Sequence, residues 1–392
     1  MTTLGNPPAP TVDATQQIRR SVFADRATQT IPVFYVLGYY VGSDLPMAQF
    51  LADNYAFCER YFASHLGPTF PNRMYALSGD VQYDRAGEAI IDNNNGDNLQ
   101  LSRAMTIFDL LTRKRIGWRV YESFPSVTML RMFARYATDD VHIVPLHGST
   151  VPFERLQQDV DQGNLPAVTM IEPAMHHEPE DDDHPPADMY RGQLFLKGVY
   201  DTLRSNGALW QKTLLVITYD EHGGFYDHVV PPIADVRTRP MIVSDGGPSG
   251  PGPFTSSTLV THYGARVPTF VVSPWTPAGK GPDIVLDHCS IVKTILARFC
   301  GDTKPFVSDR VNASRTLEAY VSAPEPRMNV PPSPAMDPLP FPRRPGRHRM
   351  IETPPLSRKR MLSGDADFHE LTGMVARLLG RQRSSPGDEV IE

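Results

Sequence analysis

The stretch TLLVITYDEHGGFYDHVVPP, residues 213–232, indicates the fold class of this chain. Its apolar run, Leu214 to Tyr219, has the composition of a buried β-strand. The run leads directly into the polar residues Asp220, Glu221 and His222. In open α/β sheets, ligands bind beyond the carboxyl ends of the strands. The stretch therefore predicts an α/β fold with a functional site at the end of this strand.

Working outward, four more short apolar runs are bounded by Gly and Pro and are typical of buried strands. They are residues 31–37, 141–146, 167–171 and 268–273. Two segments between or after them show helical spacing. Those spacings are Phe195, Val199 and Leu203 in one segment, and Ile291, Ile295 and Phe299 in the other. Alternating strands and helices predict a mostly parallel central sheet with helices on both faces.

The remaining segments differ in composition from this alternating region. Residues 1–30 are polar and contain several prolines, so we expect a mobile N-terminal arm. One catalytic domain is predicted over 31–301. Residues 302–392 form a Pro-rich extension, in which 322–349 should be extended and poorly packed. Within this extension, residues 368–379 have the spacing of a short amphipathic helix.

Composition limits the class of protein. The chain has 392 residues, of which 41% are hydrophobic, enough for a large core. A net charge of −6 argues against nucleic-acid binding, which usually needs a basic face. No apolar run approaches the about 20 residues that cross a bilayer, and the N-terminus has no signal-peptide pattern, so the compartment stays open. The three distant cysteines are interpreted as buried thiols.

The acidic pair Asp220 and Glu221 predicts a cation site. Adjacent carboxylates repel one another and are costly to bury unless a cation balances them. With His222 and His228 nearby, oxygen and imidazole ligands would suit one divalent ion: Ca²⁺, Mg²⁺, Mn²⁺ or Zn²⁺. The alternative interpretation is a solvated acidic turn after an ordinary strand.

The segment GPTFPNRMYALSGD, residues 67–80, contains a candidate nucleophile. Thr69 stands between two prolines, and Asn72 and Arg73 follow within one turn. A hydroxyl, an amide and a guanidinium could supply a nucleophile and two donors for a phosphoryl group. The alternative is a turn with a helix N-cap, and these residues taken alone favour it.

The segment EPAMHHEPEDDDHPPAD, residues 172–188, again places polar residues after an apolar strand. His184 precedes two prolines, and its imidazole could bind metal or phosphate or protonate a leaving group. The run Glu180 to Asp183 is interpreted as a solvated acidic loop without a catalytic role.

These three segments occur in order with GWRVYES at 117–123, RVPTFVVSPW at 266–275 and DHCSIVKTILARF at 287–299. Together, over about residues 31–300, they resemble the phosphoesterase family of bacterial phospholipases C and acid phosphatase. That family belongs to the alkaline phosphatase-like superfamily. The resemblance implies an α/β sandwich, a Ser or Thr nucleophile and an active-site metal.

Matched motif by motif, the resemblance implies roles for particular residues. Thr69 takes the place of the metal-bound nucleophile and Asn72 that of the phosphate-contacting amide. Asp220 and Glu221 take the place of the metal-binding pair, and His184 that of a histidine near the phosphate. His222 and His228 share the family pattern and are candidates for proton transfer, and Arg73 is a neighbouring candidate for substrate binding.

One departure from the family pattern concerns the metal site. Members open with a strand that ends in a Glu-Asn-Arg-Ser-Phe-Asp-His type motif, whose Glu and Asn contribute to that site. Nothing similar precedes Ile31, so we expect a gap in the central sheet. Three explanations stay open: an N-terminally truncated product, ligands from elsewhere, or a defective metal site.

The expected function is metal-dependent hydrolysis of phosphoric esters through a covalent phospho-threonine. The substrate would be a phosphate ester, either a phospholipid, as for phospholipase C, or a small phosphomonoester, as for acid phosphatase. The alternative is a truncated or degenerate homologue that keeps the fold and binds phosphate or a partner without catalysis. The sequence does not indicate the oligomeric state.

Overall fold

The structure is a computed structural model, and it describes only part of the chain. The described residues are 39–82, 90, 93, 102–123, 128–149, 151–175, 180–185, 187–234, 262–301 and 308–339. The predicted arm at 1–30, the strand at 31–37 and the helix at 368–379 lie outside them. Residues 39, 40 and 223–226 belong to a separate unit, and every element below lies in the other unit.

Seven short strands form in the described residues. They are β1 (Ala56–Phe57), β2 (Trp118–Glu122), β3 (Ile143–Pro145), β4 (Val168–Ile171), β5 (Leu215–Thr218), β6 (Thr269–Val272) and β7 (Gly279–Lys280). Four of them, β3 to β6, fall inside apolar runs that the sequence predicts as strands. Those four predictions are confirmed.

The pairing of the strands differs from the single, mostly parallel sheet that was expected. Among the described residues, β3-β2-β4 form a parallel sheet, and β5-β6-β1-β7 form a second, mixed sheet. In the mixed sheet β6 runs antiparallel to both β5 and β1. Antiparallel neighbours need no helical crossover. The described residues between β5 and β6, 219–234 and 262–268, indeed contain no helix.

The helices account for most of the remaining regular structure. They are α2 (Pro46–Asn54), α3 (Thr69–Ser78), α4 (Ile107–Arg113), α5 (Glu154–Asp161), α6 (Met189–Ser205), α7 (Gly207–Trp210), α9 (His288–Ile295), α10 (Asp309–Ala313), the single turns η3 (Met129–Met132) and η5 (Glu318–Tyr320), and the π-helical turn η4 (Leu296–Cys300). In α6 the predicted stripe of Phe195, Val199 and Leu203 is buried. In α9 the fully buried apolar side chains are Cys289 and Val292. The predicted Ile295 and Phe299 are only partly buried against the same core cluster.

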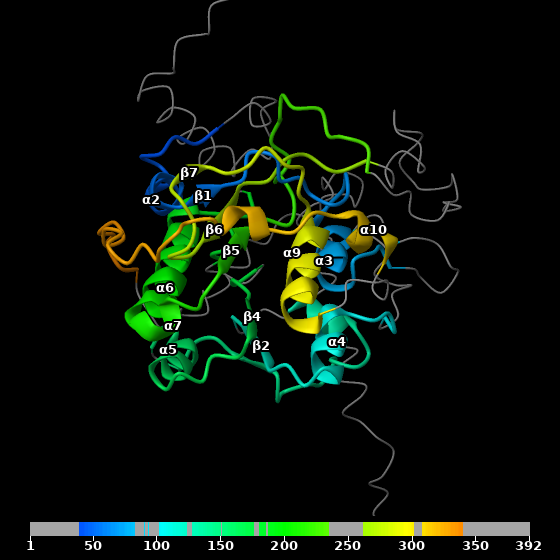
Figure 1. Cartoon of the computed structure of the whole chain (residues 1–392), viewed down its shortest axis with the longest axis horizontal. Coiled ribbons are helices and arrows are strands. Elements are labelled where there is room, and N and C mark those ends of the chain that lie inside the picture. The colour runs from blue at the N-terminus through cyan, green and yellow to red at the C-terminus, as the bar shows by residue number, and fades with distance from the viewer. Residues whose placement is uncertain are drawn as a thin grey trace, which may run out of the picture. The chain divides into compact units, whose positions relative to one another are not determined.

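Helices cover both faces of the sheets, as predicted. Neighbouring side chains of a strand point to opposite faces, and on β2 Val120 and Tyr121 enter different core clusters. Val120 packs with residues of α3, α4 and α9, whereas Tyr121 packs with residues of α2, α5 and α6. Figure 1 shows the strands between these two groups of helices.

The packed body continues past residue 301, where a domain boundary was expected. Val311, Leu317 and Tyr320 are buried in the core. Residues 321–339 contain no helix or strand, Val330 is buried, and Arg327 donates its backbone N–H to the Pro274 carbonyl at 2.8 Å. Among the described residues 322–339 most side chains are exposed and Val330 alone is buried, while 340–349 lie outside the described part of the chain.

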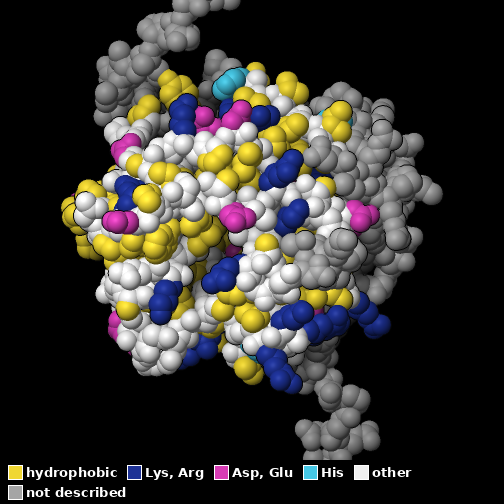
Figure 2. Space-filling view, in the orientation of Figure 1, with side chains coloured by type: hydrophobic (Ala, Val, Ile, Leu, Met, Phe, Trp, Pro, Cys, Tyr) yellow, Lys and Arg dark blue, Asp and Glu magenta, His cyan; other side chains and the backbone are white. Residues whose placement is uncertain are grey.

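Cys58, Cys289 and Cys300 are free and buried, as predicted. None of the helices in the described part of the chain is both long and apolar enough to cross a bilayer. Figure 2 shows hydrophobic, acidic and basic side chains interspersed on one face of the molecule.

Candidate functional site

Thr69 is the first residue of α3, and the loop before it is held in place by Asn72. The Asn72 Oδ1 atom accepts a hydrogen bond from the His65 N–H at 2.9 Å, and its Nδ2 donates to the carbonyls of Gly67 and Pro68 at 2.9 and 3.0 Å. Thr69 is 6% exposed, and its hydroxyl bonds to no described residue. The structure thus leaves the predicted nucleophile unengaged.

The same bonds assign Asn72 a role different from phosphate contact. Its side chain is fully buried, and both ends of its amide bond to the backbone of the loop. Buried polar groups are almost always paired in this way. In this structure Asn72 shapes the loop that presents Thr69.

Arg73 lies one helical turn after Thr69, so both side chains stand on the same side of α3. Its Nε donates to Asp220 Oδ2 at 2.9 Å, and its Nη1 donates to Glu172 Oε2 at 2.6 Å. Glu172 directly follows β4, and Asp220 follows β5 by one residue. Arg73 therefore links the start of α3 to the carboxyl ends of two strands that belong to different sheets.

Glu172 is a member of this site that the sequence interpretation missed. Besides Arg73, its carboxylate accepts the Thr128 hydroxyl at 3.0 Å, and its side chain is only 4% exposed. The sequence could have indicated Glu172, because it follows the apolar run 167–171 directly, just as Asp220 follows its own apolar run.

The Arg73 contacts keep this part of the site charged. Burial by itself would raise the pKa of Asp220, but the Arg73 guanidinium outweighs burial and holds that pKa below its usual value. Burial likewise disfavours the charged form of Arg73, but the carboxylates of Glu172 and Asp220 raise its pKa. Nε and Nη1 of the guanidinium donate to these carboxylates. Arg73 therefore cannot use this pair of nitrogens for a bidentate contact with a phosphate.

The donors around Asp220 have the chemistry that a divalent ion prefers, but among the described residues fewer than three His, Cys, Asp or Glu side chains converge there. Asp220 and Glu221 offer hard oxygens, yet Asp220 accepts the Glu221 N–H on Oδ1 and Arg73 on Oδ2. Glu221 lies 3.4 Å from His222 Nδ1. Within the described ranges no group of three or more His, Cys, Asp and Glu side chains converges as a metal site. Arg73 supplies the positive charge beside Asp220 in this structure.

The acidic loop after β4 is packed, so its interpretation as a solvated segment is wrong. Asp183 accepts a hydrogen bond from the Tyr219 hydroxyl at 2.7 Å, and its Oδ1 atom is buried without a partner. A Cβ atom on Gly192 of α6 would lie 1.8 Å from that oxygen. Burial, reinforced by the neighbouring charges of Asp182 and Asp188, raises the pKa of Asp183 to about 7. The contact with Tyr219 places this loop at the carboxyl end of β5.

The three candidate histidines stand in different surroundings. His184 is half-buried in the packed loop, where its backbone N–H donates to Asp182 Oδ1 at 3.2 Å. His222 is half-buried too, and burial lowers its pKa, which favours the neutral imidazole. His228 is 80% exposed and faces Asp227 at 3.6 Å. We therefore place His228 outside the buried cluster.

A fourth histidine, which the sequence interpretation left without a role, contacts the cluster. His288 is the first residue of α9, and its Nε2 lies 2.7 Å from the Asp220 carbonyl oxygen. The motif DHCSIVKTILARF contains this residue, but nothing local in that motif indicates a partner 68 positions away.

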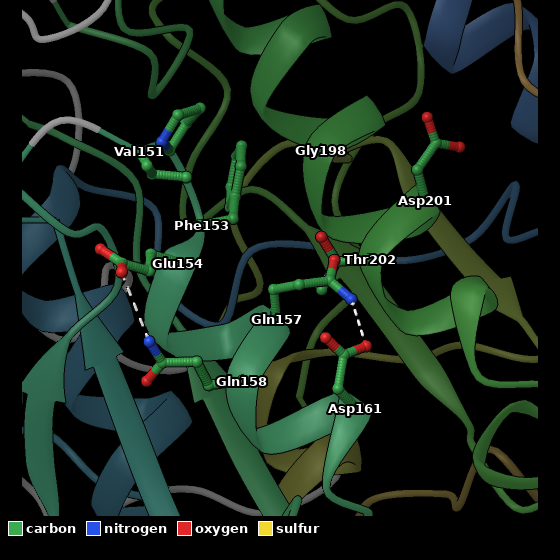
Figure 3. A pocket seen from close by; sticks show the side chains of 10 residues that line it. Val151, Phe153, Glu154, Gln157, Gln158, Asp161, Gly198, Asp201 and Thr202 are labelled. Atoms are coloured by element: carbon green, nitrogen blue, oxygen red, sulfur yellow. Dashed lines mark hydrogen bonds between the residues drawn. The ribbon is translucent and has the colours of Figure 1, made fainter.

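A surface hollow between α5 and α6 is a less suitable candidate. Figure 3 shows Glu154, Asp161 and Asp201 around it, and none of the described residues that line it is basic. An acidic lining would repel a phosphate ester. The cluster around Arg73 is therefore the candidate active site.

The described part of the chain is an α/β fold in which Arg73, on the helix that begins with Thr69, reaches carboxylates beyond two strand ends. A model of the Phosphoesterase family matches residues 11–300, and the chain belongs to that family. The family resemblance inferred from the six ordered motifs is thereby confirmed.

Characterised relatives carry the name phospholipase C. Non-specific phospholipase C4 of Arabidopsis thaliana is 32% identical over 307 residues, which cover 76% of this chain and 53% of that protein. The non-hemolytic phospholipase C of Pseudomonas aeruginosa is 30% identical over 296 residues, covering 69% and 41%. The chain thus spans about half the length of the curated relatives that it matches.

Among solved structures, a protein in the alkaline phosphatase superfamily from Vibrio parahaemolyticus aligns with a TM-score of 0.40 and 13% identity. The alignment covers 71% of this chain and 68% of that one. The lipoteichoic acid synthase LtaP from Listeria monocytogenes aligns with a TM-score of 0.40 and 11% identity, over 71% and 72%.

Proposed function

We propose that this chain hydrolyses phosphoric esters with Thr69 as the nucleophile. The observation that carries the proposal is the position of Thr69. Its hydroxyl is unengaged, and it stands one turn before Arg73, which reaches Glu172 and Asp220 beyond β4 and β5. The N-terminus of α3 also favours a phosphate, because its backbone N–H groups and dipole attract negative charge.

The proposed reaction has two displacements. In the first, Thr69 Oγ1 bonds to phosphorus while the bond from phosphorus to the alcohol oxygen breaks. An imidazole, for which His184 and His222 are the candidates, takes the Thr69 hydroxyl proton and passes a proton to the departing alcohol oxygen. In the second, water attacks the phospho-threonine, phosphate or a phosphorylated head group departs, and Thr69 regains its proton.

We propose Asp220 and Glu221 as ligands of a divalent ion, since two adjacent carboxylates offer it hard oxygens. Such an ion would supply positive charge for the phosphoryl oxygens. It would compete with Arg73 for Asp220, so binding depends on how readily that ion pair opens. As substrate we propose a phospholipid, with release of its head group, because several relatives are named phospholipase C.

The test is Thr69→Val, which removes the attacking oxygen while nearly keeping the side-chain volume. We expect turnover of p-nitrophenyl phosphocholine and p-nitrophenyl phosphate to fall on the order of 10³-fold or more. The free energy of unfolding should change by no more than about 1 kcal/mol. Each assay includes Ca²⁺, Mg²⁺, Mn²⁺ and Zn²⁺ in turn. Thr169→Val, on β4, is the matched control and should stay active.

Two results would contradict the proposal in different ways. Turnover that survives Thr69→Val would remove Thr69 from the role of nucleophile. A folded wild-type chain without turnover in any metal would favour the non-catalytic homologue. The engagement of Asp220 by Arg73 is the observation that supports this second candidate.

A further inference from the structure

We propose that His288 is a positioning residue for the candidate active site, holding the backbone of Asp220 and the loop that leads to Thr69 in one arrangement. The inference rests on the proposed function, because it concerns the same site. It goes further by assigning a role to a residue outside the cluster of carboxylates and hydroxyl that would do the chemistry.

The first contact is made by the imidazole. A carbonyl oxygen can only accept, so the 2.7 Å contact with Asp220 requires that His288 Nε2 carries the proton. In the neutral ring Nδ1 is then an acceptor, and the Tyr61 hydroxyl lies 3.3 Å from it and can donate. The side chain is 1% exposed, so water does not compete for either bond. Both ring nitrogens are thereby fixed in one tautomer.

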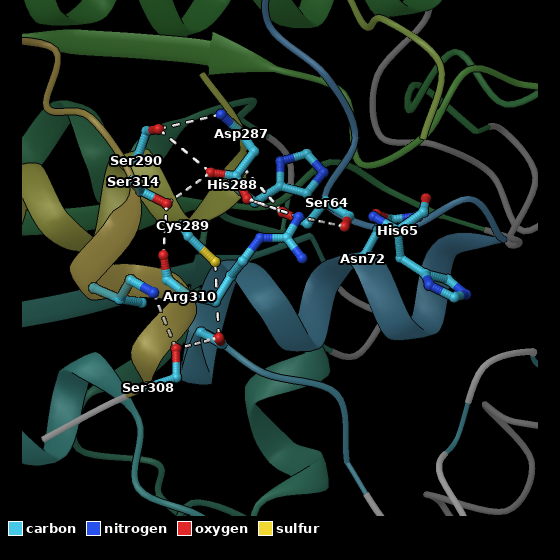
Figure 4. A network of polar contacts seen from close by, with 12 residues as sticks. Ser64, His65, Asn72, Asp287, His288, Cys289, Ser290, Ser308, Arg310 and Ser314 are labelled. Carbon is cyan, nitrogen blue, oxygen red and sulfur yellow. Dashed lines mark hydrogen bonds and ion pairs between the residues drawn. The ribbon is translucent and has the colours of Figure 1, made fainter. Parts of the chain in front are cut away.

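The second contact is made by the backbone. The His288 N–H donates to Ser64 Oγ at 3.1 Å, and that hydroxyl donates in turn to Asp287 Oδ2 at 2.9 Å. The Ser64 carbonyl accepts from Arg310 Nη2 at 2.9 Å. Ser64 directly precedes the loop that Asn72 shapes before Thr69. Figure 4 shows this network around the start of α9.

The element that carries His288 is well anchored. Asp287 and Ser290 form a capping box at the start of α9, a motif that satisfies the free N–H groups of a helix end. Cys289 and Val292 are buried in the same core cluster as residues of α3. The N-terminus of α9 is therefore a fixed point from which one residue reaches both the Asp220 segment and the Thr69 loop.

The experiment compares His288→Gln with His288→Asn. The glutamine Nε2 atom can occupy the position of the imidazole Nε2 and donate to the Asp220 carbonyl, whereas the asparagine amide is too short to reach it. We expect kcat to stay within about fivefold of wild type for His288→Gln and to fall about 100-fold for His288→Asn, with KM within about threefold. His142→Asn is the matched control, because this half-exposed ring contacts Asp139 and Trp118, and kcat should stay nearly unchanged.

A second measurement does not depend on activity. In protein labelled with ¹⁵N-histidine, the His288 Nε2–H proton should appear as a slowly exchanging imidazole resonance that disappears in His288→Asn. Wild-type turnover together with an unchanged kcat in His288→Asn would overturn the inference, as would equal losses in the Gln and Asn variants. Absence of the protected resonance would also overturn it. An inactive wild type with the resonance present would instead count against the proposed function alone.

Discussion

Asp183 combines three properties that bear on its charge state. Its backbone has a φ of 65°, one of its carboxylate oxygens is buried without a partner, and the other accepts the Tyr219 hydroxyl. Positive φ costs energy for a residue with a side chain, although Asp tolerates it better than most. The packed loop that contains His184 therefore keeps a carboxyl group in an unfavourable setting at the end of β5.

This setting predicts a pH dependence of stability. The pKa of Asp183 is raised from 3.8 to about 7, so between those values the folded chain holds a proton that the unfolded chain has lost. The contribution of this group to stability is therefore greatest at low pH and is lost as the pH rises from about 4 through 7. Asp183→Asn should remove this loss, because the amide cannot ionise and can still accept from Tyr219.

Urea denaturation at pH 4, 5, 6 and 7 measures the effect. We expect the difference in free energy of unfolding, Asp183→Asn minus wild type, to become more positive as the pH increases. Asp161→Asn, at an exposed position on α5, is the control and should follow the wild-type curve. A constant difference between Asp183→Asn and wild type across this range would show that Asp183 does not titrate as described.

At the scale of elements, residues 321–339 form a segment without helix or strand that we name the C-terminal strap. It is held mainly by long side chains that bond to backbone carbonyls. Arg327 Nη1 donates to the carbonyls of Asn54 and Thr276 at 2.9 and 2.7 Å, and Arg204 Nη1 donates to that of Pro331 at 2.6 Å. The strap has no helix or strand of its own, and these bonds, the backbone bonds of Ala323 and Arg327 and the buried Val330 help to attach it.

Arg327→Ala should therefore release part of the strap. It leaves two carbonyls without their donor, and we expect a loss of about 1–3 kcal/mol in local stability. Limited proteolysis followed by mass spectrometry should show cleavage within 321–339 that is faster than in wild type. Arg60→Ala is the control, because the Arg60–Asp283 pair is exposed and such pairs contribute little. Equal protection of wild type and Arg327→Ala would mean that other contacts hold the strap.

At the scale of the whole molecule, the described core consists of clusters on both faces of the sheets. The three cysteines lie in two of these clusters. Cys289 and Cys300 lie in the cluster that contains α3 and α4, and Cys58 lies in another with β6 and η5. Burial raises the pKa of all three thiols, which makes them unreactive in the folded state.

The thiols therefore report whether the molecule unfolds as one unit. We expect no reaction with a thiol reagent in the native state, and three thiols reacting together across the urea transition that circular dichroism records. Single-cysteine variants, with the other two cysteines replaced by alanine, identify each thiol. Reaction of Cys58 at a urea concentration well below that transition would show that its cluster opens separately.

Some features follow from the sequence alone. The apolar runs at 141–146, 167–171, 214–219 and 268–273 are strands in the structure, because their short apolar composition makes burial in a sheet favourable whatever lies around them. The polar residues that follow two of these runs marked the region of the candidate site for the same local reason. The six ordered motifs also sufficed to place the chain in the Phosphoesterase family.

Other features depend on contacts between residues far apart in the chain, and only the tertiary structure decided them. This group includes the direction of β6 and the contact between Asp220 and His288. It also includes the bonds of Arg73 to Glu172 and Asp220, which lie 99 and 147 positions further along the chain. The commitment of the Asn72 amide to the loop backbone and the burial of Asp183 do too, although their contacts are closer in sequence. A local pattern shows that a side chain is polar, but its partner is set by which elements pack together. Once buried, each polar group must pair with whatever donor or acceptor that packing brings within reach.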